Sequence, residues 1–233
     1  MFVLCTSVAG SGRDHVFSLA SAIEIIEEMG FPADYFVSPN WSRTSSADWN
    51  RELCFRLGLI LEHVRPEVIV FDGTWPYQGL INACREYGKA KIVWSHRGLH
   101  QADKTKSFPH QNMFSLIIKP GEAGDESGLE ESDFDCPQVR VPPVCLLREE
   151  ELLDRVQARR AMGLSENGRY ALFSLGAGNI NDVENIGAGL IQQLQRAGFE
   201  VVWANNPISI KDVDLPEGVQ PVGISPCPLF SRF

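Results

Sequence analysis

Glycines and a histidine stand together in the first turn of the chain, in a pattern suited to ligand contact. The segment Gly10-Ser11-Gly12 follows an apolar run, and His15 comes shortly after it. Glycines let the backbone approach a ligand closely, and the N–H groups that open a following helix bind polar or anionic atoms. A histidine in the first turn of a helix is kept neutral and can act as a base. The same residues also suit a plain structural turn with an exposed histidine, and they match neither a dinucleotide fingerprint nor a P-loop.

Two further apolar runs end in polar residues. Asp72 follows Val68–Phe71, where a carboxylate either caps the next helix or faces a ligand. If Asp72 lies beside His15, it would orient the imidazole ring and stabilise its protonated form. His96 and Arg97 end the next run, and they either contact a hydroxylated ligand or belong to a loop with one satisfied histidine.

A fourth turn, in the second half of the chain, has the composition of a diphosphate cradle. Small residues and a hydroxyl precede a predicted helix, whose N-terminus favours anions. A tight turn with an asparagine cap is the alternative. The residues concerned are Ser174, Gly176, Gly178 and Asn179. Two Asp-x-Asp triplets, at 133–135 and 212–214, lie in polar loops and predict no metal site.

Short apolar runs alternate with helical patterns, which is typical of βαβ units and a parallel sheet. The predicted strands are at 2–8, 35–37, 68–71, 91–95, 114–118, 139–144, 170–175, 200–204 and 219–222. The predicted helices are at 15–29, 47–64, 76–87, 149–162 and 181–197. Ligands of such sheets bind at the carboxyl ends of the strands. Each of the four polar turns follows a predicted strand.

Composition narrows the class of protein. The 233 residues carry a formal net charge of -9, which argues against nucleic acid as the main partner. Seven acidic residues between 122 and 135 make up most of this charge, and such a run is usually a solvated loop. The six cysteines show no Cys-x-x-Cys pair, which favours a reducing, cytoplasmic compartment.

Taken in order, the four turns resemble those of GT-B-fold glycosyltransferases, closest to the MurG-like and UDP-glycosyltransferase groups. The turn that ends in His15-Val16-Phe17 resembles the MurG-type segment Gly-Gly-x-Gly-Gly-His-Val-Phe-Pro, and departs from it at Arg13-Asp14 and Ser18. Asp72 stands where UDP-glycosyltransferases carry a strand-end aspartate that pairs with their catalytic histidine. The stretch at 173–178 resembles the first strand and turn of the family's donor domain.

The resemblance implies two Rossmann-like parallel-sheet domains, with the acceptor in residues 1–143 and a UDP-linked sugar donor in residues 144–233. It implies transfer of a hexosyl group to an acceptor hydroxyl with inversion, without metal or cofactor. His15 would take the proton of the acceptor hydroxyl while Asp72 supports the imidazolium. Residues 10–12 and 96–97 would contact the acceptor. The turn at 174–179 would hold the departing diphosphate.

The length departs from this family plan. The strongest nucleotide-binding signature of the family, a glycine-rich turn before a helix with Glu or Gln, belongs beyond the fourth turn, and the sequence ends at Phe233. We therefore expect the second domain to be incomplete. Three hypotheses stay open: a C-terminally truncated glycosyltransferase, a non-catalytic or half-enzyme subunit that needs a separate donor-domain chain, and a nucleotide-sugar epimerase of the same fold. MurG-like enzymes often act at membrane surfaces, so peripheral membrane association is also open.

Overall fold

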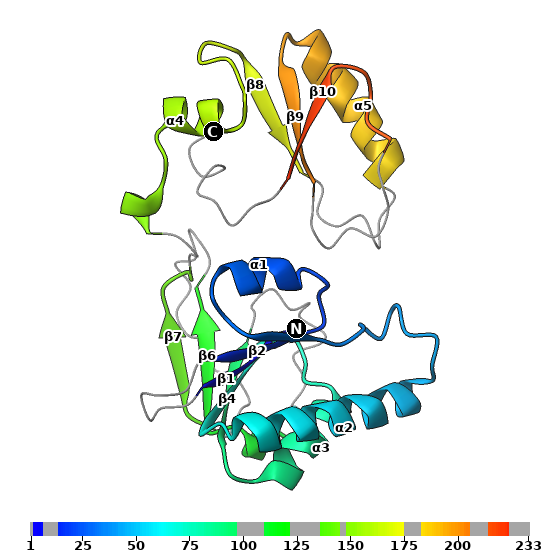
Figure 1. The fold of residues 1–233 in the computed structure, drawn as a ribbon, viewed down its shortest axis with the longest axis vertical. Coiled ribbons are helices and arrows are strands. Elements are labelled where there is room, and N and C mark those ends of the chain that lie inside the picture. Colours follow the sequence, from blue (N-terminus) through cyan, green and yellow to red (C-terminus); the bar gives the residue numbers. More distant parts are fainter. Residues whose placement is uncertain are drawn as a thin grey trace. The chain divides into compact units, whose positions relative to one another are not determined.

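The computed structural model describes residues 2–6, 14–96, 110–121, 136–144, 148–174, 183–205 and 214–223. The chain forms two units, Met1–Val144 and Cys145–Phe233, whose boundary follows the Pro142-Pro143 pair. Both units combine helices with a sheet (Figure 1). Each has its own apolar core.

The first unit is built on a seven-stranded sheet with the order β3-β2-β1-β4-β5-β6-β7. All of its strands run in the same direction except β1, which is antiparallel to both neighbours, β2 and β4. The α/β class is confirmed, with one antiparallel strand inside an otherwise parallel sheet. The strands are β1 (Phe2–Thr6), β2 (His15–Ser18), β3 (Ala33–Tyr35), β4 (Val68–Gly73), β5 (Lys91–His96), β6 (Leu116–Pro120) and β7 (Gln138–Val141).

Helices cover both sides of this sheet. The short helix α1 (Ile23–Glu28) lies on one side, and α2 (Ser46–Val64) and α3 (Gln78–Tyr87) pack together on the other (Figure 1). A short 3-10 turn (Gln111–Met113) precedes β6. The buried residues of α2 recur at every fourth position, which directs one apolar stripe toward the sheet: Trp49, Leu53, Leu57 and Leu61.

The ends of α2 follow from local chemistry. Ser45 precedes the helix, and its hydroxyl oxygen accepts a hydrogen bond from the Asp48 backbone N–H at 3.1 Å. This bond satisfies one of the N–H groups that a helix start leaves unpaired. At the other end, Arg65 has a φ of 53°, and the left-handed backbone there stops the helix before Pro66.

The core of the first unit lies between the sheet and the pair α2 and α3. Phe71 from β4 and Trp94 from β5 are buried in it. Successive side chains of a strand point to opposite faces of the sheet. The next residues of the two strands, Asp72 and Ser95, therefore face away from α2 and α3.

One predicted helix is wrong in its first half. Residues His15–Ser18 form strand β2, which pairs with β1 on one side and with β3 on the other. Val16 and Phe17 are β-branched and aromatic, so they suit a buried strand, and the sheet provides backbone partners on both sides. The helical pattern is realised only from Ile23. His15 is therefore not in the first turn of a helix.

The second unit has a three-stranded parallel sheet with the order β10-β9-β8. The elements of this unit are α4 (Arg155–Ala161), β8 (Tyr170–Phe173), α5 (Val183–Arg196), β9 (Glu200–Asn205) and β10 (Val219–Gly223). The predicted helix over 149–162 is wrong at its start. Asp154 and Gln157 form a reciprocal capping box that begins α4, and only a 3-10 turn (Glu149–Glu151) precedes it. The remaining predicted elements are present with shifted bounds.

Candidate functional site

The strand order of the first unit contains one switch point, between β1 and β4. From β1 the chain adds β2 and β3 in one direction, and from β4 it adds β5, β6 and β7 in the other. Open α/β sheets bind ligands outside the carboxyl ends of their strands, at such a switch point. The carboxyl ends of β2, β4 and β5 lie at the same edge, together with the amino end of the antiparallel β1. We refer to this edge as the carboxyl edge.

Asp72 and Ser95 occupy the carboxyl edge beside the switch point. Ser95 is paired with Asp72 across β4 and β5, and its hydroxyl donates a hydrogen bond to Asp72 Oδ1 at 3.1 Å. Asp72 is also in register with Phe2, which is in register with Ser18. Both Asp72 and Ser95 are half-buried. The Asp72 carboxylate and the hydroxyl-bearing residues Ser95 and Ser18 therefore lie at the same level of the sheet.

Packing beneath this pair fixes the ends of the two strands. Trp94 is fully buried, and its indole N–H donates to the Gly73 carbonyl oxygen at 2.8 Å. The Trp94 ring also contacts the rings of Trp75 and Phe114, with centroids 5.8 Å and 5.1 Å away. A Cβ on Gly73 would come within 2.7 Å of the Phe71 ring, so the strand end accepts only glycine without a shift of that ring. Trp94 and Phe71, on the face of the sheet opposite to Asp72, thus fix the backbone that carries Asp72.

His15 lies far from this edge. It is in register with Cys5, and Cys5 with Ile69, three residues before Asp72 in β4, which is roughly 10 Å along the strand. Ile69 is buried in the core against α2 and α3, so His15 also belongs to the opposite face of the sheet from Asp72. The predicted pairing of His15 with Asp72 is wrong, because the antiparallel β1 between β2 and β4 places them at opposite ends and faces.

A different carboxylate partners His15. Its Nε2 lies 2.8 Å from Asp34 Oδ2 in β3, and the other oxygen of Asp34 lies 4.0 Å from the Arg56 guanidinium of α2. The histidine therefore has the carboxylate neighbour that the sequence predicts for it, at another position. Asp34 carries no signal in the sequence, because its role depends on the pairing of β3 with β2.

His96 ends β5 on the face of Trp94. Its side chain is buried, and the two rings are 4.5 Å apart in an edge-to-face arrangement. By strand alternation His96 faces the side of α2 and α3, whereas Ser95 faces the side of Asp72. The carboxyl edge therefore brings Asp72 together with Ser95, which the strand-end motif did not single out. A signal was present, because Phe71-Asp72 and Trp94-Ser95 repeat the same aromatic-polar order.

Most of the other predicted site residues lie outside the described ranges. These are Gly10, Ser11, Gly12, Arg97, Gly176, Gly178 and Asn179. Ser174 is described, as the exposed residue that follows β8. Within the described ranges, no three His, Cys, Asp or Glu side chains gather closely enough to hold a metal ion. No helix in the same ranges has the length and apolar character needed to cross a membrane.

Comparison with solved structures relates this architecture to known enzymes. The UDP-GlcNAc 2-epimerase from Neisseria meningitidis bound to UDP-GlcNAc aligns with a TM-score of 0.50 at 15% identity, over 89% of this chain and 63% of the epimerase. The UDP-N-acetylglucosamine 2-epimerase from Rickettsia bellii aligns with a TM-score of 0.49 at 14% identity, over 86% of this chain and 58% of the epimerase. Spinosyn forosaminyltransferase aligns with a TM-score of 0.48 at 11% identity, over 89% of this chain and 66% of the transferase.

The first of these likenesses shows the fold, which is α/β of the GT-B type. The chain spans less than two thirds of the length of each of these three enzymes. Neither a protein-family model nor a curated protein sequence matches the chain.

Proposed function

We propose that this chain binds a nucleotide sugar and takes part in its conversion, with the carboxyl edge of the first unit in contact with the sugar. One observation carries the proposal: Asp72 and Ser95 stand hydrogen-bonded at the switch point of a fold shared with an epimerase that binds UDP-GlcNAc. Ligand binding at this place is general for open α/β sheets. The likeness in fold adds the class of ligand.

Each group has a simple role in this proposal. The Asp72 carboxylate accepts hydrogen bonds from sugar hydroxyls or takes a proton from the reacting group. Ser95 orients that carboxylate through its hydroxyl. In the second unit, Ser174, the exposed residue that follows β8, contacts the diphosphate. Residues 1–143 then hold the acceptor or sugar side, and residues 144–233 the nucleotide side.

Two reactions are candidates for such a site. Transfer of a hexosyl group to an acceptor hydroxyl is supported by the resemblance of the four turns to MurG-like and UDP-glycosyltransferase sequences. Epimerisation of the sugar is supported by the fold likeness to the Neisseria meningitidis enzyme. The partner of His15 bears on this choice, because the histidine–aspartate pair proposed for transfer does not form with Asp72.

Binding is tested first, with UDP and UDP-GlcNAc titrated into the chain by isothermal calorimetry. We expect UDP-GlcNAc to bind, and we expect Asp72→Asn to weaken its binding about tenfold while UDP binding stays unchanged, since Asp72 contacts the sugar. Asp34→Asn is the matched control, because it removes a carboxylate from the edge strand β3 on the opposite face of the same sheet. The proposal fails if UDP-GlcNAc does not bind, or if Asp72→Asn binds it as the unchanged chain does.

The products distinguish the reactions. Incubation with UDP-GlcNAc in D2O, followed by proton NMR, would show a C2 epimer with deuterium at C2 if the chain catalyses epimerisation, because inversion there breaks the C–H bond. Release of UDP only when a hydroxylated acceptor is added would favour transfer. Binding without either product would favour a subunit that needs a separate chain.

A further inference from the structure

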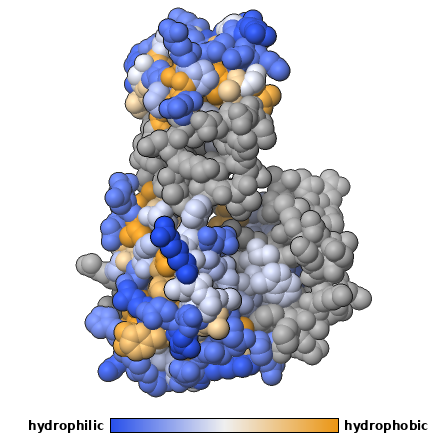
Figure 2. Space-filling model, turned by 90° about the vertical axis from the view of Figure 1, so that its right-hand side faces the viewer, coloured by the Kyte–Doolittle hydropathy of each residue, from blue (hydrophilic) through white to orange (hydrophobic). Residues whose placement is uncertain are grey.

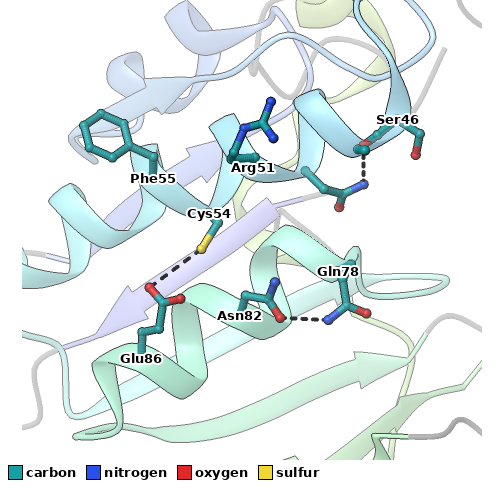
Figure 3. Close-up of a pocket in the computed structure, with 9 residues that line it drawn as sticks. Ser46, Arg51, Cys54, Phe55, Gln78, Asn82 and Glu86 are labelled. Atoms are coloured by element: carbon teal, nitrogen blue, oxygen red, sulfur yellow. Dashed lines mark hydrogen bonds between the residues drawn. The ribbon is translucent and has the colours of Figure 1, made fainter.

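A concave surface lies on the other side of the sheet from Asp72 and Ser95. A groove of about 760 Å³ runs between the solvent-facing sides of α2 and α3. The coloured part of the face in Figure 2 is mainly hydrophilic, with separate apolar patches. Figure 3 shows the groove itself, where Cys54 of α2 and Glu86 of α3 point toward one another. The sequence motifs and the proposed function leave these side chains without a role.

Amide side chains form the floor of this groove. Gln78 Nε2 donates a hydrogen bond to Asn82 Oδ1 at 2.8 Å, one turn along α3 (Figure 3). This bond leaves the Gln78 amide oxygen as an acceptor and the Asn82 amide N–H groups as donors. Asn50 is held at both ends, since its oxygen accepts from the Gly79 N–H and its nitrogen donates to the Ser46 carbonyl. The donors and acceptors are therefore fixed in place rather than free to rotate.

The charged groups of the groove are one carboxylate and one guanidinium. Glu86 faces Cys54, whose thiol donates to Glu86 Oε2 with a sulfur–oxygen distance of 3.9 Å (Figure 3). Arg51 also lines the groove, and its guanidinium is paired with Asp48, which is not part of the lining. Burial and the charge of Glu86 raise the pKa of the Cys54 thiol, so it stays a neutral donor. The groove thus offers a carboxylate acceptor without an unpaired cation to hold a phosphate.

An aromatic ring completes the lining. Phe55 lines the groove from α2 although its side chain is 61% exposed. An exposed aromatic face beside fixed amides and a carboxylate suits the apolar C–H face of a ring whose hydroxyls reach the polar groups.

We propose that the groove between α2 and α3 binds a neutral saccharide, with Asn82, Gln78 and Glu86 on its hydroxyls and Phe55 on its C–H face. Hydroxyls both donate and accept, as neighbouring donors and acceptors in this groove require. An anionic ligand would meet the Glu86 carboxylate, while the Arg51 guanidinium of the same groove is already paired with Asp48. An extended peptide would require an open strand edge, which two helices do not provide. This inference is independent of the proposed function, because the groove lies on the opposite face of the sheet.

Side-chain amide signals test the proposal directly. The 15N-labelled chain is titrated with maltotriose and with N,N′-diacetylchitobiose, and the side-chain NH2 signals of Asn82 and Gln78 are followed by NMR. We expect these signals to shift at millimolar saccharide. Phe55→Ala should weaken binding about fivefold. Leu59→Ala is the matched control, because Leu59 lies one turn further along α2, is 54% exposed and is outside the groove lining.

Each outcome supports or overturns the proposal. Shifts that are reduced by Phe55→Ala and retained in Leu59→Ala support it, as does loss of binding in Asn82→Leu. Absence of shifts with both saccharides overturns it. Shifts confined to backbone signals around Asp72 also overturn it, since the saccharide would then bind the carboxyl edge. A parallel titration with UDP reports on the proposed function alone, so failure of either can be recognised separately.

Discussion

His15 and Asp34 form a short contact across β2 and β3, with Nε2 and Oδ2 separated by 2.8 Å. The two side chains are 16% and 35% exposed, so the contact is partly shielded from water. Asp34 also faces Arg56 of α2 at 4.0 Å, which links the edge of the sheet to the helix layer. The histidine that the sequence presents as a catalytic base is thus held by a carboxylate of the edge strand β3, on the face of the sheet opposite to Asp72.

A double-mutant cycle tests this arrangement. We expect His15→Ala and Asp34→Ala to be coupled by about 1 kcal/mol in the free energy of unfolding, since each removes the partner of the other. His15→Ala and Asp72→Ala should be additive within about 0.5 kcal/mol, because the residues lie at opposite ends and faces of the sheet. Urea denaturation followed by circular dichroism measures all of these variants. Coupling between His15 and Asp72 would contradict the register of β1.

The sequence predicts most of the elements because their signals are local. The apolar runs that become β4 and β5 and the apolar stripe of α2 can be recognised within a few residues. Strand β2 cannot be recognised in this way, because the segment His15–Ser18 also fits a helical pattern. Its pairing with β1 and β3 makes it a strand. Nonlocal pairing overrides the local pattern there.

In the candidate site too, local signals predict positions, whereas contacts between residues depend on strand pairing. The position of Asp72 at a strand end is predictable, since ligands of open α/β sheets bind at those ends. Its contact with Ser95 depends on the register of β4 against β5, and a slip by one residue would turn Ser95 to the other face. The distance between Asp72 and His15 depends on the direction of β1, which no local pattern in Phe2–Thr6 specifies.

Gly79 sets the distance between α2 and α3. A Cβ at this position would overlap the carbonyl oxygen of Asn50 and come within 3.0 Å of Leu53 Cβ. We expect Gly79→Ala to lower the free energy of unfolding by about 2 kcal/mol, since backbone cannot give way as a flexible side chain can. Gly58→Ala in α2 is the control. It has open space around its Cβ, and it should raise stability by about 0.5 kcal/mol through helix propensity. Equal effects of the two changes would contradict close packing at Gly79.

Trp94 supports the strand end that carries Asp72. Trp94→Phe removes the indole N–H and leaves the buried Gly73 carbonyl without this donor. Together with the lost volume, we expect a decrease of about 3 kcal/mol in the free energy of unfolding. Trp41→Phe makes the same chemical change at a side chain that is 45% exposed, and should cost less than about 0.5 kcal/mol. Thermal and urea unfolding compare the two variants, and a small effect of Trp94→Phe would show that the Gly73 contact contributes little.

The thiol of Cys54 has a pH dependence that follows from its neighbours. Burial raises its pKa, and the negative charge of Glu86 together with the hydrogen bond to it raises the pKa further. The thiol therefore contributes stability that is present below the pKa of an unfolded cysteine, about 8.5, and is lost as the pH rises through the higher folded value. Comparison of the chain with Cys54→Ser at pH 7 and pH 10 measures this loss. The difference in their free energies of unfolding should favour the unchanged chain more at the lower pH.

Removal of the Glu86 charge should make Cys54 more reactive. The thiolate is the form that iodoacetamide attacks, so a raised pKa slows alkylation at pH 8. We expect Glu86→Gln to increase the alkylation rate of Cys54 severalfold, measured by mass spectrometry of the peptide that contains it. Glu62→Gln is the control, because Glu62 pairs with Lys89, which lies just beyond the end of α3, and is two turns of α2 from Cys54. If both variants react at the rate of the unchanged chain, burial alone protects the thiol, and Glu86 does not act on it.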